Sequence, residues 1–192
     1  MTTTETSRQE EATTTPETTK QEEVTTIPET TGGDESTSVT PADSFGYAPS
    51  ADHTTITINR YNGKSANVVI PDTINGMKVV KIATQSFQES DDSAVRIKSV
   101  VISEGVKEIE RLAFANCKYL EKLTIKGNSL VTIGNQAFDR CSSLKTVHLP
   151  ESVKIIGEYA FASCDTLKNI IGAKGSYAEK FASENVYVFL EK

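Results

Sequence analysis

Three phenylalanine residues recur at spacings of 24 and 23 residues, and this period constrains the fold more than any other feature of the sequence. Each one follows an alanine, precedes a cysteine by three residues and precedes a leucine by six. A fixed period of roughly 20 to 50 residues is typical of solenoids and other repeat architectures. The shared phrase Ala-Phe-x-x-Cys-x-x-Leu forms three columns: Phe114, Phe138 and Phe161; Cys117, Cys141 and Cys164; Leu120, Leu144 and Leu167.

Each repeat combines a helix-like part with a strand-like part. Ile133, Phe138 and Cys141 are spaced to lie on one face of a short helix. Val147 and Leu149 then alternate with the period of two that is typical of a strand. Because one repeat cannot bury its apolar edge alone, the repeats are expected to stack. We therefore predict an α/β repeat solenoid with one parallel β-sheet, short helical turns on the opposite side and a cap at each end.

The sequence pattern of the repeats resembles that of a known family. Residues 133–150 carry almost all of the phrase Ile-Gly-x-x-Ala-Phe-x-x-Cys-x-x-Leu-x-x-Val-x-Leu-Pro, which resembles the BspA-type leucine-rich repeat. The resemblance covers residues 54–192 and includes a weaker copy with Phe87, which has Ser90 in the cysteine column and about four extra residues after it. It implies a leucine-rich-repeat stack in a bacterial surface or secreted protein, with adhesion as the usual function.

The chain divides into a spacer and a repeat domain. Residues 1–44 contain 15 threonines, 10 acidic residues and two basic residues, with few apolar side chains. Such a segment cannot bury enough apolar surface to offset the entropy of ordering it. It is therefore predicted to be an extended, disordered stalk, with a featureless tail as the alternative. Residues 45–192 form the predicted domain, with repeats near 66–81, 82–108, 109–132, 133–155 and 156–175 and a C-terminal cap at 175–192.

Charge and hydropathy limit where the protein works. The acidic residues concentrate in the spacer, whereas residues 45–192 hold 18 basic and 16 acidic residues. A nearly neutral domain excludes a strongly basic nucleic-acid footprint, and no apolar run is long enough to span a membrane as a helix. No signal peptide follows Met1. Because the spacer is typical of a surface stalk, we expect an export signal upstream and an extracellular or cell-surface location.

The sequence shows no catalytic constellation. Only two histidines are present, His53 and His148, and neither belongs to a nucleophile or metal-ligand motif. The three cysteines occupy one column of the repeat, so they are predicted to be small buried core residues rather than ligands or disulfides. The loop containing Asp91 and Asp92 is interpreted as solvated, because two adjacent acids make a poor Ca²⁺ site. We expect no enzyme activity, no metal and no cofactor.

The best candidate surface is the outward face of the predicted sheet. If Leu123 and Ile125 point inward, alternation places their neighbours outward in continuous columns. Stacked repeats display such columns as an extended recognition surface, although β-branched packing along the ladder is the alternative explanation of the apolar members. The predicted contact residues for a protein or glycan partner on a host or neighbouring cell are Val101, Lys122, Thr124, Thr146, His148 and Ile171.

These observations favour an extracellular, monomeric protein-binding or adhesion module on a stalk, without catalysis. Two alternatives stay open. The domain could be an accessory part of a larger surface enzyme, or it could serve purely as a structural spacer. An intracellular scaffold is disfavoured by the threonine-rich segment.

Overall fold

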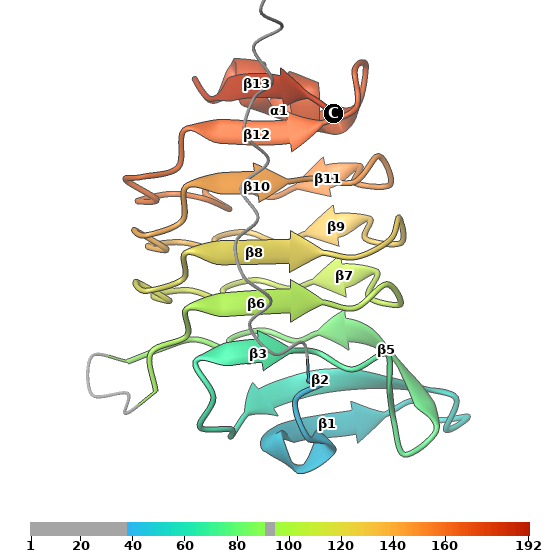
Figure 1. Ribbon diagram of the computed structural model, residues 1–192. Helices are drawn as coiled ribbons and strands as arrows, with labels where there is room; N and C mark the ends of the chain where they lie inside the picture. Colours follow the sequence, from blue (N-terminus) through green and yellow to red (C-terminus); the bar gives the residue numbers. More distant parts are fainter. Residues whose placement is uncertain (1–37, 91–94) are drawn as a thin grey trace, which may run out of the picture. The chain divides into compact units, whose positions relative to one another are not determined.

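The computed structural model describes residues 38–90 and 95–192, which form a β-solenoid whose turns stack along one axis (Figure 1). Six strands build a front sheet in which neighbouring strands are parallel. In spatial order they are β13 (Val188–Glu191), β12 (Asn169–Gly172), β10 (Thr146–His148), β8 (Lys122–Ile125), β6 (Ser99–Ile102) and β3 (Asn67–Val69). The predicted spacer lies largely outside the described residues, as do Asp91 and Asp92.

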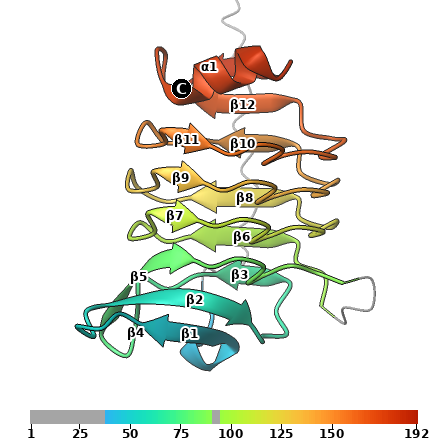
Figure 2. The same cartoon turned by 180° about the vertical axis from the view of Figure 1, so that it is seen from behind.

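A second sheet, the back sheet, lies behind the first and is visible in Figure 2. Its path runs through β1 (Phe45–Pro49), β2 (Thr55–Tyr61), β5 (Met77–Ile82), β7 (Glu108–Ile109), β9 (Thr132–Ile133) and β11 (Ile155–Ile156), and β4 (Thr73–Ile74) pairs with β5. The predicted solenoid is therefore confirmed, but the prediction of a single parallel sheet is wrong.

The predicted helical turns are also wrong, because left-handed residues interrupt each of them. In one repeat Leu112 and Asn116 have φ values of 58° and 62°, and in the next Gln136 and Arg140 have values of 56° and 61°. A right-handed helix cannot include such residues. The chain instead makes consecutive tight turns around each Ala-Phe pair. The turns return the apolar side chains to the interior at a spacing that imitates one face of a helix.

The turn side is held together by hydrogen bonds between repeats. The Phe87 N–H donates to the carbonyl oxygen of Ala113 at 2.8 Å, and the Phe114 N–H donates to that of Ala137 at the same distance. These bonds satisfy backbone groups that a helix would have paired internally. The turns therefore stack one repeat on the next as regularly as the strands do.

The phenylalanine column forms a continuous stack of rings through the core. Phe87 and Phe114 have centroids 4.7 Å apart, Phe114 and Phe138 are 5.1 Å apart, and Phe138 and Phe161 are 5.3 Å apart. These separations lie within the range in which aromatic pairs attract beyond simple burial. Phe181 of the C-terminal helix covers the end of the stack, with its ring tilted by 57° and its centroid 5.9 Å from that of Phe161.

The cysteines of the repeat are buried in the same core and link successive turns. All three thiols are buried, and none forms a disulfide. Each Sγ–H points at a carbonyl oxygen of the preceding turn, so each cysteine is a small apolar residue with one useful donor. The pairs are Cys117 with Phe87 at 3.2 Å, Cys141 with Phe114 at 3.3 Å and Cys164 with Phe138 at 3.2 Å.

The two ends of the solenoid are covered differently. At the first end, the edge strand β3 is bonded by Thr40, whose N–H donates to Val69 O at 3.1 Å and whose Oγ1 accepts from Val69 N–H at 2.8 Å. Thr40 is buried and precedes the short 3₁₀ turn Ala42–Ser44. The folded unit therefore includes residues ahead of the boundary predicted at residue 45.

At the last end, α1 (Tyr177–Glu184) packs on β12 and β13. The sequence Ser176-x-x-Glu179 at its start has the pattern of a capping box, but the two reciprocal bonds of that motif do not form. The Glu179 carboxylate accepts from the Gly175 N–H at 2.6 Å, but the Ser176 hydroxyl makes no hydrogen bond.

Candidate functional site

The outer face of the front sheet is formed by two columns of side chains that the strand register aligns. Val100, Leu123 and Val147 point into the core, so their neighbours in each strand point outward. The first column contains Asn67, Ser99, Lys122, Thr146, Asn169 and Val188, and the second contains Val69, Val101, Thr124, His148, Ile171 and Leu190. We refer to these two columns as the outer face.

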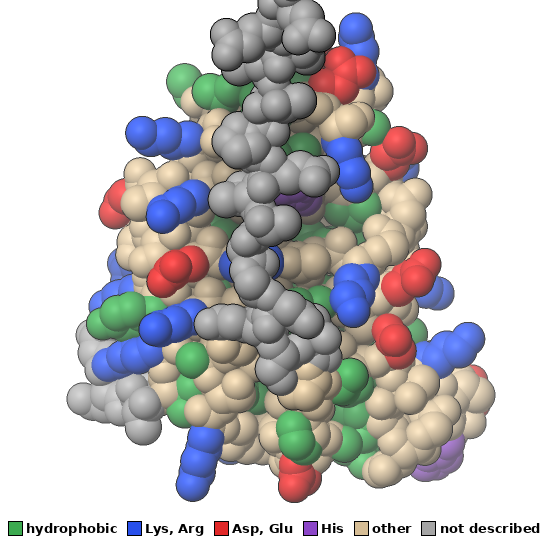
Figure 3. Space-filling model, in the orientation of Figure 1, with side chains coloured by type: hydrophobic (Ala, Val, Ile, Leu, Met, Phe, Trp, Pro, Cys, Tyr) green, Lys and Arg blue, Asp and Glu red, His purple; other side chains and the backbone are tan. Residues whose placement is uncertain are grey.

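The structure brings all six predicted contact residues together on this outer face. Val101 pairs directly with Thr124 across β6 and β8, and His148 pairs with Ile171 across β10 and β12. Lys122 and His148 are exposed, whereas Val101, Thr124, Thr146 and Ile171 are half-buried. In the space-filling view charged side chains lie along both margins of the front sheet (Figure 3).

Two apolar members of the outer face were missed by the sequence analysis. Val188 pairs with Asn169 and Leu190 pairs with Ile171, so β13 extends both columns by one strand. Their side chains are 55% and 42% exposed, unusual for large apolar residues. The alternation of Val188, Phe189 and Leu190 is the sequence signal that places both side chains on one face of a strand.

A groove crosses one end of the outer face, where β8, β10 and β12 finish. It has a volume of about 590 Å³, and His148, Ile171 and Lys192 are among its lining residues. Partial burial and the positive charge of Lys192 lower the pKa of His148 below its ordinary value. The imidazole is therefore neutral at pH 7 and can both donate and accept a hydrogen bond.

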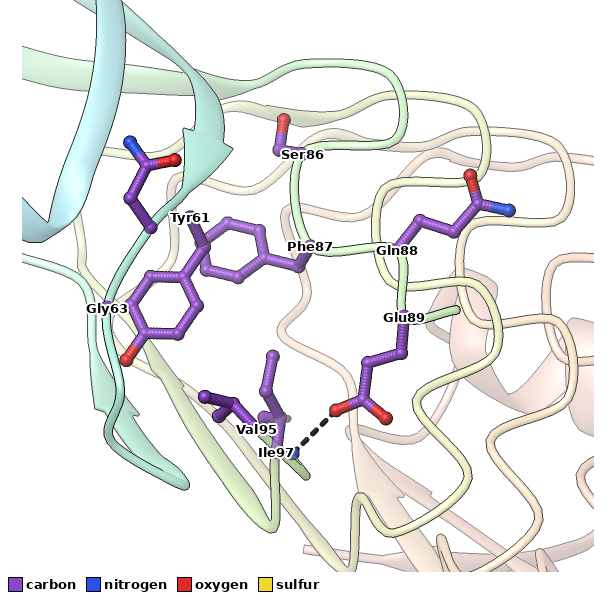
Figure 4. Close-up of a pocket in the computed structure, with 9 residues that line it drawn as sticks. Tyr61, Gly63, Ser86, Phe87, Gln88, Glu89, Val95 and Ile97 are labelled. Atoms are coloured by element: carbon purple, nitrogen blue, oxygen red, sulfur yellow. Dashed lines mark hydrogen bonds between the residues drawn. The ribbon is translucent and has the colours of Figure 1, made fainter. Parts of the chain in front are cut away.

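A smaller cavity of about 220 Å³ lies beside the weaker repeat that contains Phe87. Figure 4 shows the rings of Tyr61 and Phe87 on one side of it, Val95 and Ile97 below, and Glu89 on the other side. The Glu89 carboxylate is buried and accepts from the Ile97 N–H at 2.6 Å. Burial raises the pKa of Glu89 above its ordinary value.

The position of Glu89 gives it a structural role. The insertion in this repeat separates the turn from its strand, and the Glu89–Ile97 bond ties the two together again. In addition, the Glu89 N–H donates to Ala115 O in the next repeat at 3.2 Å. No sequence pattern indicates this link, because an isolated glutamate in an insertion usually remains in solvent.

The described residues contain no constellation typical of metal or thiol chemistry. Within 38–90 and 95–192, no group of three or more histidine, cysteine, aspartate or glutamate side chains could hold a metal ion. Burial raises the pKa of the Cys117 thiol well above its ordinary value, which keeps it protonated and unreactive. No helix in the same ranges is both long and apolar enough to cross a membrane.

The comparisons with known proteins agree with this architecture. Residues 54–182 match the family described as BspA type leucine rich repeat region, in 6 copies. No curated protein matches the sequence.

Among solved structures, a T. pallidum leucine rich repeat protein is 31% identical with a TM-score of 0.54, over 70% of this chain and 71% of that one. A leucine-rich repeat protein from Bacteroides capillosus is 27% identical with a TM-score of 0.58, over 67% of this chain and 94% of that one. The pneumococcal vaccine antigen PcpA shares the fold, at 24% identity and a TM-score of 0.50, over 66% of this chain and 30% of that one. The family match covers most of the repeat domain, and this chain belongs to the BspA-type leucine-rich repeat family.

Proposed function

We propose that the protein is an extracellular binding module that recognises a protein partner through the outer face of the front sheet. The observation that carries the proposal is the second column, in which Val69, Val101, Ile171 and Leu190 are apolar and only partly covered. A column of partly covered apolar side chains, interrupted by Thr124 and the neutral His148, matches the apolar centre of a protein interface. Exposed lysines at its margins match the polar rim.

Family membership supports a binding role, because BspA-type repeats form a non-catalytic family. A surface location is supported by the same family membership and by the threonine-rich composition of residues 1–44, which would hold the domain away from a cell as a spacer. The nearly balanced charge of the domain implies weak long-range steering. We therefore expect binding through the outer face to depend only mildly on salt.

Site-specific photo-crosslinking tests the proposal. Benzoylphenylalanine is placed at Thr124 on the outer face or at Thr132 on the back sheet, and the protein is incubated with cells that carry candidate partners. Both positions are half-buried strand residues, so the two variants are matched. The proposal predicts a specific protein adduct from Thr124 alone. An adduct from Thr132 alone would place the site on the other sheet.

A second step measures the affinity of the purified partner for charge variants. Lys122→Glu with His148→Glu lowers the net charge of the outer face by three, and Lys154→Glu with Thr132→Glu lowers that of the back of the molecule by the same amount. The first pair is expected to abolish binding because it charges a desolvated centre. Equal binding by both pairs would exclude the outer face as the contact surface.

A further inference from the structure

A row of lysines follows one edge of the front sheet, where its strands begin. Lys98, Lys145 and Lys168 occupy the position before β6, β10 and β12, and Lys122 is the first residue of β8. All four are exposed. We refer to these four residues as the lysine edge. In Figure 3 lysine and arginine side chains predominate along this margin, whereas basic and acidic side chains alternate along the opposite one.

The lysines are held close together by the backbone. The Lys168 N–H donates to Lys145 O at 3.2 Å, so these two residues lie on adjacent strands at the same level. Adjacent strands are only about 4.8 Å apart, and like charges placed opposite each other destabilise a sheet. Among the described residues, no carboxylate forms an ion pair with any of the four lysines. Glu121, which lies between Lys98 and Lys145 in the row, pairs with neither.

The opposite edge of the same sheet shows that this arrangement is not a general feature of the surface. The charged residues that follow the strands there are of both signs. They are Asp72, Glu104, Lys126, Glu151 and Lys174. A lysine in each of four successive turns is therefore found at one edge of this sheet and not at the other.

A hollow between the last two lysines indicates the chemistry of the ligand. It has a volume of about 430 Å³ and is lined by Lys145, Asp165, Thr166, Lys168 and Asn169. The two ammonium groups can bind an anion, and the Asn169 amide adds donors. The Asp165 carboxylate can only accept, so it disfavours a plain anion but suits a ligand that also carries hydroxyl groups.

An exposed aromatic ring lies on the same edge. Tyr119 is 47% exposed and, like Thr166, immediately precedes the leucine of its repeat. The guanidinium carbon of Arg96 lies 5.5 Å from the ring centroid and holds the ring in place. An amphipathic ring of this kind offers an apolar surface to the C–H face of a sugar.

We propose that the lysine edge binds a linear acidic polysaccharide. Carboxylate or sulfate groups would contact the stacked lysines, sugar hydroxyls would donate to Asp165, and a ring would pack on Tyr119. Lysines in successive turns of the solenoid suit a polymer that carries negative charge along its length. This site adjoins the protein-binding face proposed above and shares Lys122 and Asn169 with it, but binding at this site is expected to depend steeply on salt.

Biolayer interferometry with two immobilised polysaccharides tests the proposal. Polygalacturonate carries carboxylates and heparin carries sulfates, so the two surfaces distinguish the source of the negative charge. Lys145→Gln with Lys168→Gln is compared with Lys126→Gln with Lys174→Gln, which removes the same charge from the opposite edge. The first pair is expected to weaken binding by about tenfold or more and the control pair by less than about twofold, since only the first removes direct contacts.

Binding to polyglutamate is measured as well, because it distinguishes a site for acidic sugars from a site for any acidic peptide. Asp165→Ala should weaken binding to the preferred polysaccharide by removing a hydroxyl acceptor, but should strengthen binding to polyglutamate by removing repulsion. Tyr119→Ser should weaken only the polysaccharide. Equal losses from both lysine pairs, tighter binding of polyglutamate than of either polysaccharide, or no polysaccharide binding at low salt would overturn the proposal.

Discussion

Replacing Phe138 by alanine tests how far the ring stack stabilises the solenoid. Phe138 is fully buried and stacks on Phe114 and Phe161 with centroids at 5.1 and 5.3 Å. Truncating a buried phenylalanine costs about 3–5 kcal/mol through lost burial and the cavity left behind. The two ring pairs account for about 1–3 kcal/mol of that loss, at about 0.5–1.5 kcal/mol each. Phe138→Ala should therefore be among the most destabilising single changes in the chain.

Phe138→Leu separates the two contributions because it keeps most of the volume and removes the stacking. Its expected cost is about 1–3 kcal/mol, close to that of the ring pairs alone. Urea denaturation followed by circular dichroism measures both variants, with Tyr159→Ala as a control at an exposed position. If Phe138→Ala costs no more than Tyr159→Ala, the ring stack does not stabilise the fold.

Three further predictions concern the first turn, the thiols and the buried carboxyl. Removing residues 1–37 should leave stability unchanged, whereas removing 1–44 also deletes Thr40 and should cost about 1–3 kcal/mol from two lost hydrogen bonds at β3, measured by thermal melts. Iodoacetamide at pH 8 should leave Cys117 and its two equivalents unlabelled in the native protein and label all three in urea; labelling of the native protein would contradict their burial. Glu89→Gln keeps the acceptor for Ile97 N–H and should raise the melting temperature at pH 7 but not at pH 4. A raised folded-state pKa means that stability falls as pH rises above the ordinary glutamate pKa, and an equal effect of this variant at both pH values would refute it.

The repeat columns were sufficient to predict the stack and the outer face. Phe114, Phe138 and Phe161 recur because each must meet its equivalent in the next turn, and that requirement also sets the strand register. Once Leu123 is assigned to the core, the period of two places Lys122 and Thr124 outward without further information.

The turn side could not be predicted from apolar spacing alone. The pattern around Phe138 fits a helix, but the left-handed conformations of Gln136 and Arg140 are not encoded by glycine or asparagine at those positions. They are imposed by packing and by the hydrogen bonds between turns, such as Phe138 N–H to Ala160 O at 2.8 Å. Long-range contacts of this kind override local propensity.

The lysine edge was missed because its members look unremarkable one at a time. Lys145 and Lys168 are 23 residues apart in the sequence, and each is an ordinary exposed lysine. Only the parallel register shows that they lie side by side, with no described carboxylate paired to them. The Glu89 cavity was missed for a related reason, since its walls come from separate turns.

The measurement that tests the central claim most directly is a methyl NMR spectrum of the protein with its crosslinked partner, once isolated. Val101, Ile171 and Leu190 report on the outer face, and Val131 and Ile155 are exposed apolar residues next to and within strands of the back sheet. If the outer face is the recognition surface, the first three signals shift or broaden on binding and the other two do not. Changes confined to Val131 and Ile155 would contradict the account.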